Sequence, residues 1–143
     1  MRVLQLVYAS RPFGFDANAL EAIMAIARKR NGRDGITGAL ICRHDLFMQM
    51  LEGPRDKVTS CFARILRDDR HVEVSLLWCG DAARRLFPDW AMREDAWPSW
   101  MWGAAALSDG AVANATAEES RQVFVRLSKE PQQRGRLHEA LGH

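Results

Sequence analysis

The sequence opens with a strand-like run and continues with a helix-like one. Residues Val3–Ser10 are mostly apolar and include β-branched residues, which favours a strand. Side chains of a strand point alternately to the two faces of a sheet, so Leu6, Tyr8 and Ser10 are expected to share one face. From Leu20 onward the apolar residues recur at intervals of three and four, which predicts a helix. The chain is therefore expected to begin with a strand followed by a helix.

Residue types at both ends of this helix predict where it starts and stops. Asn18, with Glu21 three residues later, resembles a capping box, so Asn18 is the expected N-cap. The basic run Arg28–Arg30 suits a helix C-terminus, and Gly32 is the residue expected to end the helix. The buried stripe between these limits is predicted to consist of Leu20, Ile23, Met24 and Ala27, with Asn31 continuing the row.

A pair of strands and a second helix are predicted next. The segments Gly35–Cys42 and Leu46–Glu52 are largely apolar, and the residues RHD between them suit a hairpin connection. Gly53 and Pro54 then start the second helix, because proline is tolerated in a first helical turn. The predicted apolar stripe of this second helix is Val58, Cys61, Phe62, Ile65 and Leu66.

The pattern after the second helix completes the fold class. Val72–Cys79 predicts a fourth strand, with Val72, Val74, Leu76 and Trp78 on one face. A short helix or turn, DAARRLFPDW, and a short fifth strand, WAMRE, follow. The order β-α-β-β-α-β plus one strand predicts an α+β, ferredoxin-like fold, in which an antiparallel-rich sheet carries two helices on one face.

The last third of the chain is expected to form an extension separate from the domain of residues 1–95. This C-terminal helical extension, residues 96–143, is predicted to pack on the other face of the sheet. The small residues of LSDGAVANATA, at about 107–116, indicate a linker, and a helix is expected over about 117–129. The expected limits of this helix are the capping box of Thr116 and Glu119 and the stop at Pro131.

Composition and charge exclude several classes of protein. At 143 residues, the chain fits one domain. With 48% hydrophobic and 27% charged residues, it has the composition of a globular protein. The net charge of +2 gives no argument for a nucleic-acid partner, and no apolar run reaches the roughly 20 residues of a membrane span. Three cysteines without a CxxC pair indicate free thiols in a reducing cytoplasm, with no disulfide and no metal site.

Two predicted strands carry polar groups at core positions. Tyr8 is the only tyrosine of the chain, and Gln49 lies within the apolar run FMQML. A glutamine amide offers two donors and two acceptor lone pairs, so the Tyr8 phenol alone cannot complete its hydrogen bonds. Asn31 continues the stripe of the first helix towards the same region. Either these three groups satisfy one another, or they bind a planar ligand with alternating donors and acceptors.

Five segments, taken in order and spacing, resemble a known family. They are LVYAS, RNGRDGITGALI, FMQMLEGP, FARILRDDRHVEV and RRLFPDWAMR, and they cover about Leu4–Arg93. Any one segment is a weak signal, but as a set they are specific. The chain is similar to BLUF domains, the flavin-binding sensors of blue light, and in particular to the short single-domain members with a helical C-terminal extension.

This resemblance implies a noncovalently bound FAD between the two helices, although FMN or riboflavin would make the same ring contacts. Ile23 and Ile65 match the apolar residues that sandwich the flavin ring. Asn31 matches the asparagine at the pyrimidine-side edge of the ring, and Gln49 matches the glutamine beside flavin N5 and O4. Tyr8 matches the tyrosine bonded to that glutamine. The alternative for Ile23 and Ile65 is a purely structural role, as core residues of any such fold.

The other site residues implied by the resemblance lie around this centre. Ser10 matches a serine near the tyrosine, and either Trp90 or Met92 is expected to approach Gln49. Phe47 is also expected to bind the cofactor. The positions expected around the polar edge of the ring and the rest of the dinucleotide are Arg64, Asp68, Arg70 and His71. Arg64 and Asp68 have an alternative interpretation as a surface ion pair, because they are four residues apart on one helix.

The function implied by the resemblance is light sensing without enzymatic activity. Excited flavin takes an electron and then a proton from Tyr8, and Gln49 relays hydrogen between them. Rotation or tautomerisation of the Gln49 amide then changes the hydrogen bond at flavin O4 and shifts the absorption to the red. The rearrangement is expected to pass through the strand of Trp90 and Met92 to the C-terminal helix. From there it reaches an unknown partner protein or an interface of a homo-oligomer.

Three other functions are compatible with a fold of this order. An RNA-binding module of this fold needs exposed aromatic and basic residues on its central strands, and FMQMLEGP has one aromatic and no basic residue. A small hydrolase needs a general base, which the glycine-rich segment near Asn31 lacks. The strongest alternative is a cofactor-free protein-interaction domain, in which tryptophans of the C-terminal segment form the interface. Those tryptophans, which packing alone also explains, are Trp97, Trp100 and Trp102.

Overall fold

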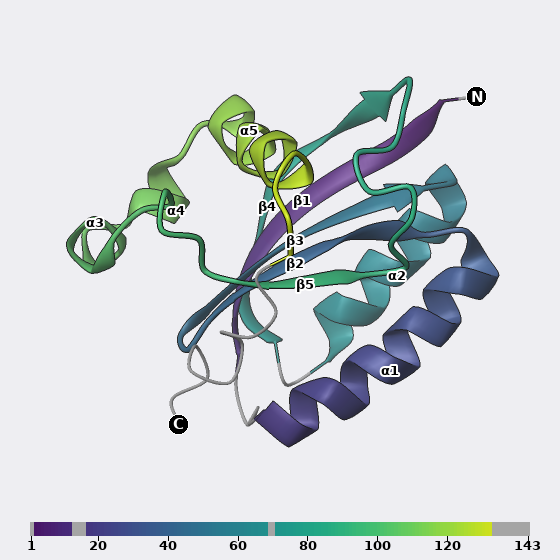
Figure 1. The fold of residues 1–143 in the computed structure, drawn as a ribbon, viewed down its shortest axis with the longest axis horizontal. Helices are drawn as coiled ribbons and strands as arrows, with labels where there is room; N and C mark the ends of the chain where they lie inside the picture. The colour runs from purple at the N-terminus through teal and green to yellow at the C-terminus, as the bar shows by residue number, and fades with distance from the viewer. Residues whose placement is uncertain (1, 13–16, 69–70, 133–143) are drawn as a thin grey trace.

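The computed structural model describes residues 2–12, 17–68 and 71–132, in which five strands form one sheet with helices on both faces (Figure 1). The elements from the N-terminus to the fourth strand are β1 (Val3–Pro12), α1 (Ala17–Asp34), β2 (Thr37–Arg43), β3 (Leu46–Gly53), α2 (Arg55–Arg67) and β4 (His71–Ala82). The remaining elements are β5 (Arg93–Ala96), α3 (Ala104–Ser108), α4 (Ala111–Asn114) and α5 (Ala117–Ser128).

The sheet has the strand order β4-β1-β3-β2-β5. The β4/β1, β1/β3 and β3/β2 pairs are antiparallel, whereas β5 runs parallel to β2. This topology confirms the predicted α+β, ferredoxin-like order with one extra strand. The register of β1 and β3 sets Tyr8 directly opposite Gln49, so the two polar core residues are cross-strand neighbours.

The two faces of the sheet carry separate cores. On one face, α1 and α2 pack against alternate residues of the strands, and on the other face α5 covers the sheet, as Figure 1 shows. Leu6 and Tyr8 belong to the core under α1 and α2, and Val7 belongs to the core under α5, as the alternation of β1 predicts. The predicted placement of a C-terminal helix on the second face is therefore confirmed.

Both predicted ends of α1 are wrong. The helix begins at Ala17, so Asn18 lies inside its first turn and is not the N-cap. At the other end, α1 continues through Gly32 to Asp34, and Gly35 adopts the left-handed conformation, with φ of +70°. The amide of Ile36 donates to the carbonyl oxygen of Asn31 at 2.9 Å, which closes the helix in the manner of a Schellman motif. Of the two glycines, Gly35 has the positive φ that ends the helix, whereas Gly32 lies within it.

Gly38 has a packing role in the GITG segment. A Cβ atom at this position would lie 2.0 Å from the carbonyl oxygen of Met50 on β3, so no side chain fits there. The Gly38 amide also donates to the carbonyl oxygen of Trp90 at 3.1 Å. Gly38 therefore lets the loop before β5 lie close against the start of β2, which itself begins at Thr37 and not at Gly35 as predicted.

The predicted faces of the fourth strand are also corrected. Register shifts occur between Val7 and Tyr8 and between Ala9 and Arg11, so β4 contains bulges and its alternation is interrupted. As a result Trp78 and Leu77 pack on the core under α5, while Val74 packs on the core under α1 and α2. Val72 and Leu76, predicted to share their face with Val74 and Trp78, are exposed. On α2, Leu66 is likewise exposed, although Ile65 beside it packs on the core.

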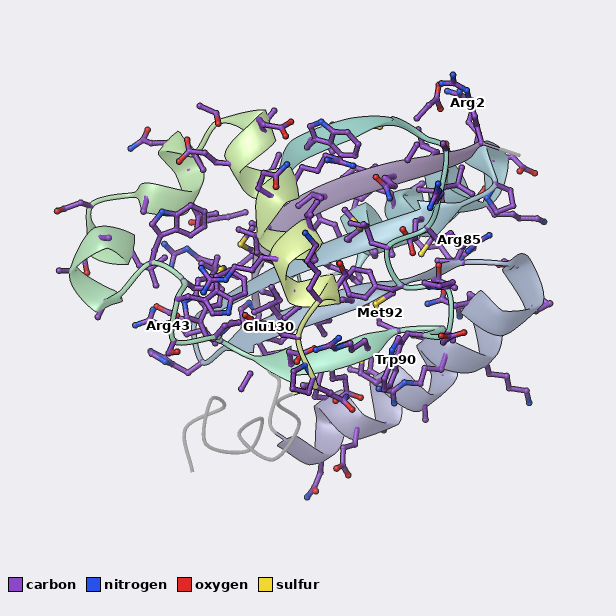
Figure 2. All side chains as sticks on the ribbon, turned by 45° about the horizontal axis from the view of Figure 1, so that its top comes forward. Arg2, Arg43, Arg85, Trp90, Met92 and Glu130 are labelled. Atoms are coloured by element: carbon purple, nitrogen blue, oxygen red, sulfur yellow. The ribbon has the colours of Figure 1, made fainter. Side chains whose placement is uncertain are left out.

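The segment before β5 is a loop and not a strand. Strand β5 starts at Arg93, so Trp90 and Met92 precede it, as Figure 2 shows. The reason is that the backbone amides of Leu86 and Phe87 donate to the side chain of Glu52, which turns the chain out of the sheet. The predicted strand WAMRE therefore overlaps the structure only at its last two residues.

The C-terminal extension contains more helix than expected. The segment expected as a linker holds α4 and the end of α3, and alanine is frequent in both. Helix α5 has the predicted capping box: the Glu119 amide donates to the Thr116 hydroxyl, and the Thr116 amide donates to the Glu119 carboxylate. The three tryptophans of this region are partly buried against the core under α5, which favours the packing interpretation over an exposed interface: Trp97, Trp100 and Trp102.

Candidate functional site

A cavity of about 320 Å³ lies between α1, α2 and the face of the sheet that these helices cover. Its volume falls at the lower end of the range of small-molecule pockets. Seven of the residues predicted to bind a cofactor line it, together with Tyr8: Ile23, Asn31, Phe47, Gln49, Arg64, Ile65 and Asp68. The fold thus brings together, from β1, α1, β3 and α2, groups that are separated by up to 60 residues in the sequence.

Tyr8 and Gln49 form the polar centre of the cavity wall. Both lie on adjacent antiparallel strands, and the Tyr8 hydroxyl donates to Oε1 of Gln49. The phenol is completely buried, and its ring lies 5.5 Å from the ring of Phe62 on α2. Burial, together with the negative charge that nearby Cys61, Cys42 and Asp68 can carry, raises the pKa of Tyr8 well above its usual value. The phenol is therefore neutral and able to donate throughout the physiological range of pH.

The second end of the Gln49 amide contacts Met92. Nε2 of Gln49 donates to Sδ of Met92 at 3.2 Å, and Met92 is buried. Trp90 is 38% exposed, and its ring lies 6.0 Å from the guanidinium carbon of Arg93. Of the two residues expected to approach Gln49, the structure places Met92 there. A thioether sulfur is a weak acceptor, so the donor end of the amide is only weakly held.

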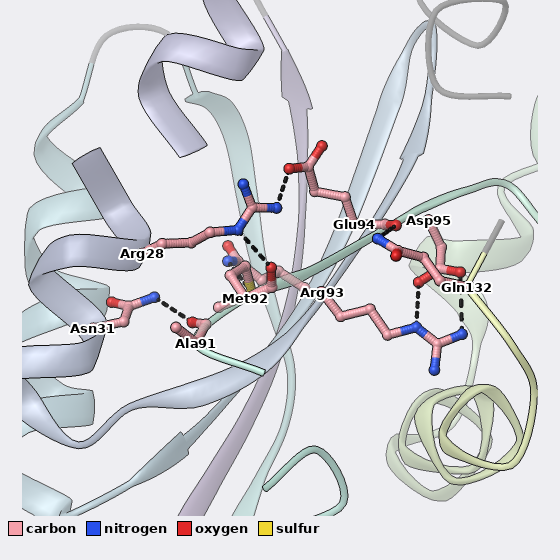
Figure 3. A network of polar contacts seen from close by, with 9 residues as sticks. Arg28, Asn31, Ala91, Met92, Arg93, Glu94, Asp95 and Gln132 are labelled. Atoms are coloured by element: carbon pink, nitrogen blue, oxygen red, sulfur yellow. Dashed lines mark hydrogen bonds and ion pairs between the residues drawn. The ribbon is translucent and has the colours of Figure 1, made fainter. Parts of the chain in front are cut away.

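Asn31 joins the cavity to the loop before β5. It is buried near the end of α1, and its Nδ2 donates to the carbonyl oxygen of Ala91 at 2.9 Å. Figure 3 shows this bond beside the contacts of Arg28 with the same loop. Asn31 therefore lines the cavity, as predicted, and also holds Ala91, the neighbour of Met92. The sequence did not predict this second contact.

Arg64 brings an incompletely bonded cation to the cavity. Its Nε and Nη2 atoms are buried and make no hydrogen bond to any residue that the structure describes. The carboxylate of Asp34 is at the limit of an ion pair, with its Oδ2 3.9 Å from Nη2. A buried donor without a partner costs about 1–3 kcal/mol, so these nitrogens suit a ligand that offers acceptors.

The lining has the chemistry that a flavin needs. Ile23 and Ile65 provide apolar walls on the two helices, and the amides of Asn31 and Gln49 provide donors and acceptors for the edge of a planar ring. The two orphan nitrogens of Arg64 lack acceptors, which a flavin carbonyl or phosphate supplies. The residues present therefore fit the cofactor that the family resemblance implies.

Five of the predicted site residues are not among those that line the cavity: three lie elsewhere in the structure, and two side chains fall outside its described part. Ser10 is buried on β1 beyond Tyr8, and Met92 contacts the Gln49 amide. Trp90 is exposed in the loop before β5. Arg70 lies outside the described residues. His71 begins β4, and its side chain is likewise outside the described part of the structure.

Several lining residues were not predicted as site residues. Leu20, Met24 and Ala27 belong to the predicted stripe of α1 and were assigned only to the core. Leu40 lines the cavity from β2. Strand alternation places it on the same face as Cys42, and this signal was sufficient to find it. Arg30, three residues after Ala27 on the same helix face, also lines the cavity, but the sequence assigned its basic run only to the helix C-terminus.

Among the described residues, no cluster of three or more histidine, cysteine, aspartate or glutamate side chains is arranged to hold a metal ion. Within the same residues, no helix combines the length and the apolar character that crossing a membrane requires.

Comparison with known proteins gives the family. The model of the BLUF family, described as sensors of blue-light using FAD, matches residues 3–93. The photoactivated adenylate cyclase subunit beta of Euglena gracilis is 39% identical over 74 residues, which are 51% of this chain and 9% of that protein. The blue light- and temperature-regulated antirepressor BluF of Escherichia coli (strain K12) is 35% identical over 68 residues, or 48% of this chain and 17% of that protein. The matches thus cover less than a fifth of either relative.

A solved structure matches over most of the chain. The dark-state structure of BlrB, a BLUF protein, has a TM-score of 0.74 and 28% identity, and it covers 90% of this chain and 96% of that one. The similarity therefore extends beyond the 3–93 segment into the C-terminal helices.

Proposed function

The chain belongs to the BLUF family of blue-light sensors that use FAD, and we propose that Tyr8, Gln49 and Met92 carry its response to light. The observation that supports this assignment is the continuous relay at the cavity wall. The Tyr8 hydroxyl donates to one end of the Gln49 amide, and the other end donates to Met92 Sδ. Gln49 also lines the cavity, so a change in its orientation is presented directly to a bound ring.

Bound flavin supplies absorption of blue light and, once excited, a strong oxidising potential. The protein supplies the proton path. Because the Tyr8 hydroxyl donates to Gln49 Oε1, a proton that leaves the phenol moves to that oxygen. The amide can then exchange its donor and acceptor ends by rotation or tautomerisation, since its hold on the Met92 sulfur is weak. The cavity-facing side of Gln49 therefore presents a different hydrogen-bonding group after illumination.

The remaining lining residues hold the cofactor in this proposal. Ile23 and Ile65 sandwich the ring, Asn31 bonds its pyrimidine-side edge, and Phe47 closes the sheet side. Arg64 and Asp68 also line the cavity and are proposed to hold the polar part of the cofactor. Arg70, His71 and Ser10 complete the proposed set on the family resemblance alone.

The output is proposed to be a change of contacts and not catalysis by this chain. Phe87, in the loop before β5, packs edge-on against Phe124 of α5, with ring centroids 6.5 Å apart. A shift of this loop therefore reaches the helix on the opposite face of the sheet. By their names, the Euglena relative is a photoactivated cyclase subunit and the Escherichia relative a blue light-regulated antirepressor. In each of them, light therefore controls a second activity of the same protein. We propose likewise that this chain acts through a downstream protein or through self-association.

Absorption spectroscopy tests the assignment. The purified protein, supplied with FAD, is expected to be yellow and to show a reversible red shift under blue light. Gln49→Leu removes both ends of the amide and is expected to keep the yellow colour but to lose the shift. Gln122→Leu, on the exposed face of α5, is the matched control and should behave as the parent protein.

Two results would contradict the proposal. A protein that remains colourless with FAD, FMN and riboflavin would support the cofactor-free interaction domain. A Gln49→Leu variant with an unchanged red shift would leave flavin binding intact but remove Gln49 from the light response.

A further inference from the structure

The loop that carries Met92 is held by α1 more than by the sheet. Strand β5 pairs with β2 only from Arg93 to Ala96, so Ala91 and Met92 have no strand partner among the described residues. Their backbone carbonyls instead accept from side chains of α1. Asn31 Nδ2 donates to the Ala91 oxygen at 2.9 Å, and Arg28 Nε donates to the Met92 oxygen at 3.0 Å (Figure 3).

Arg28 makes a second bond from the same guanidinium group. Its Nη2 pairs with Oε1 of Glu94, the second residue of β5. A guanidinium is planar and holds its donors in a fixed fork, so the two bonds fix the Met92 backbone relative to the Glu94 side chain. The α1 helix therefore clamps the segment on both sides of Arg93.

Glu94 depends on this contact. Its side chain is only 1% exposed, whereas the Arg28 side chain is 32% exposed. The other carboxylate oxygen, Oε2, is buried and has no hydrogen-bond partner among the described residues. A buried carboxylate that loses its only counter-charge is strongly unfavourable. Loss of Arg28 would therefore make the start of β5 rearrange.

From these contacts we propose that Arg28 and Glu94 are positioning residues that hold Met92 Sδ against the Gln49 amide and thereby set the rate at which the light-induced state returns to the dark state. The proposal rests on the proposed function of Gln49. Neither residue lines the cavity, so the pair acts on the photochemistry only through Met92. With the clamp released, Met92 restrains the amide less, and the amide returns to its dark orientation faster.

The clamp is also connected to the C-terminal segment. The carbonyl oxygen of Glu94 accepts from Nε2 of Gln132, which follows α5. The same short stretch of chain therefore contacts the cavity-lining helix α1 on one side and the segment that follows α5 on the other. A displacement of Met92 that moves Glu94 would change this contact.

The decisive experiment compares dark-recovery rates of flavin-loaded variants after a blue-light pulse. Arg28→Gln is expected to accelerate recovery about tenfold, which corresponds to about 1.4 kcal/mol in the barrier. Glu94→Gln keeps an acceptor for Arg28 and should show a smaller acceleration. Arg28→Lys keeps the charge but lacks the planar fork, so its rate should lie between those of Arg28→Gln and the parent protein.

Lys29→Gln is the matched control. Lys29 is exposed, lies next to Arg28 on α1 and has no hydrogen bond or ion pair with the described residues. Its substitution removes the same charge from the same turn and is expected to leave recovery unchanged. If Arg28→Gln lowered the thermal stability but recovered at the rate of Lys29→Gln, the clamp would be structural only and the proposal would be wrong.

A second readout does not require flavin. Methionine methyl signals in NMR spectra of the flavin-free protein report how well Met92 is held, with Met92→Leu identifying its signal among the six methionines. Arg28→Gln, or Arg28→Lys if the former does not fold, should shift and sharpen the Met92 signal, whereas Lys29→Gln should not. An unmoved signal overturns the clamp. Absence of any red shift in the parent protein would instead overturn the proposed function. It would not affect what the NMR signal of Met92 shows about the clamp.

Discussion

Gln49 and Glu52 lie three residues apart on β3, are both buried, and face opposite sides of the sheet. The Glu52 carboxylate accepts four hydrogen bonds: from Gln5 at 3.0 Å, from Thr37 at 2.9 Å, and from the amides of Leu86 and Phe87 at 2.8 Å each. The Gln49 amide has one strong partner, the Tyr8 hydroxyl, and one weak partner, the Met92 sulfur. One polar group is saturated with partners, and the other is not.

This difference indicates what each group does. Four donors fix the Glu52 carboxylate in one orientation, so it can only hold the loop of Leu86 and Phe87 in place. The Gln49 amide can change orientation at the cost of a weak contact, and it borders a cavity. The closed face under α5 therefore provides stability, and the face with the cavity provides the response. Three experiments test this division, in order of decreasing effect on stability.

Removal of the Glu52 carboxylate should cause the largest loss. Glu52→Ala leaves four donors, two buried and two partly buried, without their acceptor, and we expect the free energy of unfolding to fall by about 3–5 kcal/mol. Urea unfolding followed by circular dichroism measures this. Glu118→Ala, on the exposed first turn of α5, should change it by about 0.5 kcal/mol or less. Equal losses in the two variants would show that the Glu52 network is not a main support of the fold.

Removal of the Tyr8 hydroxyl should affect function more than stability. Tyr8→Phe removes one neutral hydrogen bond, so the free energy of unfolding should fall by about 1 kcal/mol. The variant is expected to retain flavin and to lose the reversible red shift, because Gln49 Oε1 no longer receives a proton from the phenol.

Phe62→Leu is the matched control for this substitution. It alters the ring that packs 5.5 Å from the Tyr8 ring but leaves the phenol in place, so the red shift should persist. A normal photocycle in Tyr8→Phe would assign the response to another donor and remove the contrast between the two faces.

Titration of the phenol should show no change over most of the accessible pH range. Because Tyr8 is the only tyrosine, the near-ultraviolet absorption of the phenolate reports this residue alone. Burial raises the pKa of Tyr8 in the folded protein. The phenol should therefore titrate at about pH 10 in the unfolded chain and only at higher pH in the folded protein. The folded state then binds the proton more tightly, and stability is unaffected below about pH 10 and falls as the pH rises above it. Coincident titrations of folded and unfolded protein would show that the phenol is accessible to water.

The sequence by itself determined the order of the first four strands and two helices, the two faces of β1, and the central residues of the cavity wall. These features depend on local periodicity and on the segments shared with the BLUF family, and both are properties of neighbouring residues. The same reasoning located Tyr8, Gln49, Ile23 and Ile65, because polar residues in apolar strands and apolar stripes on helices are visible without a fold.

The tertiary structure decided where elements end and which distant groups meet. Gly35 rather than Gly32 ends α1 because its backbone adopts a positive φ, and the bulges of β4 redirect Val72 and Leu76 to solvent. The choice of Met92 over Trp90 follows from Glu52 and Gly38, which bend and seat the loop before β5. Such contacts join residues up to 66 positions apart, as between Arg28 and Glu94, and no local pattern encodes a partner at that separation.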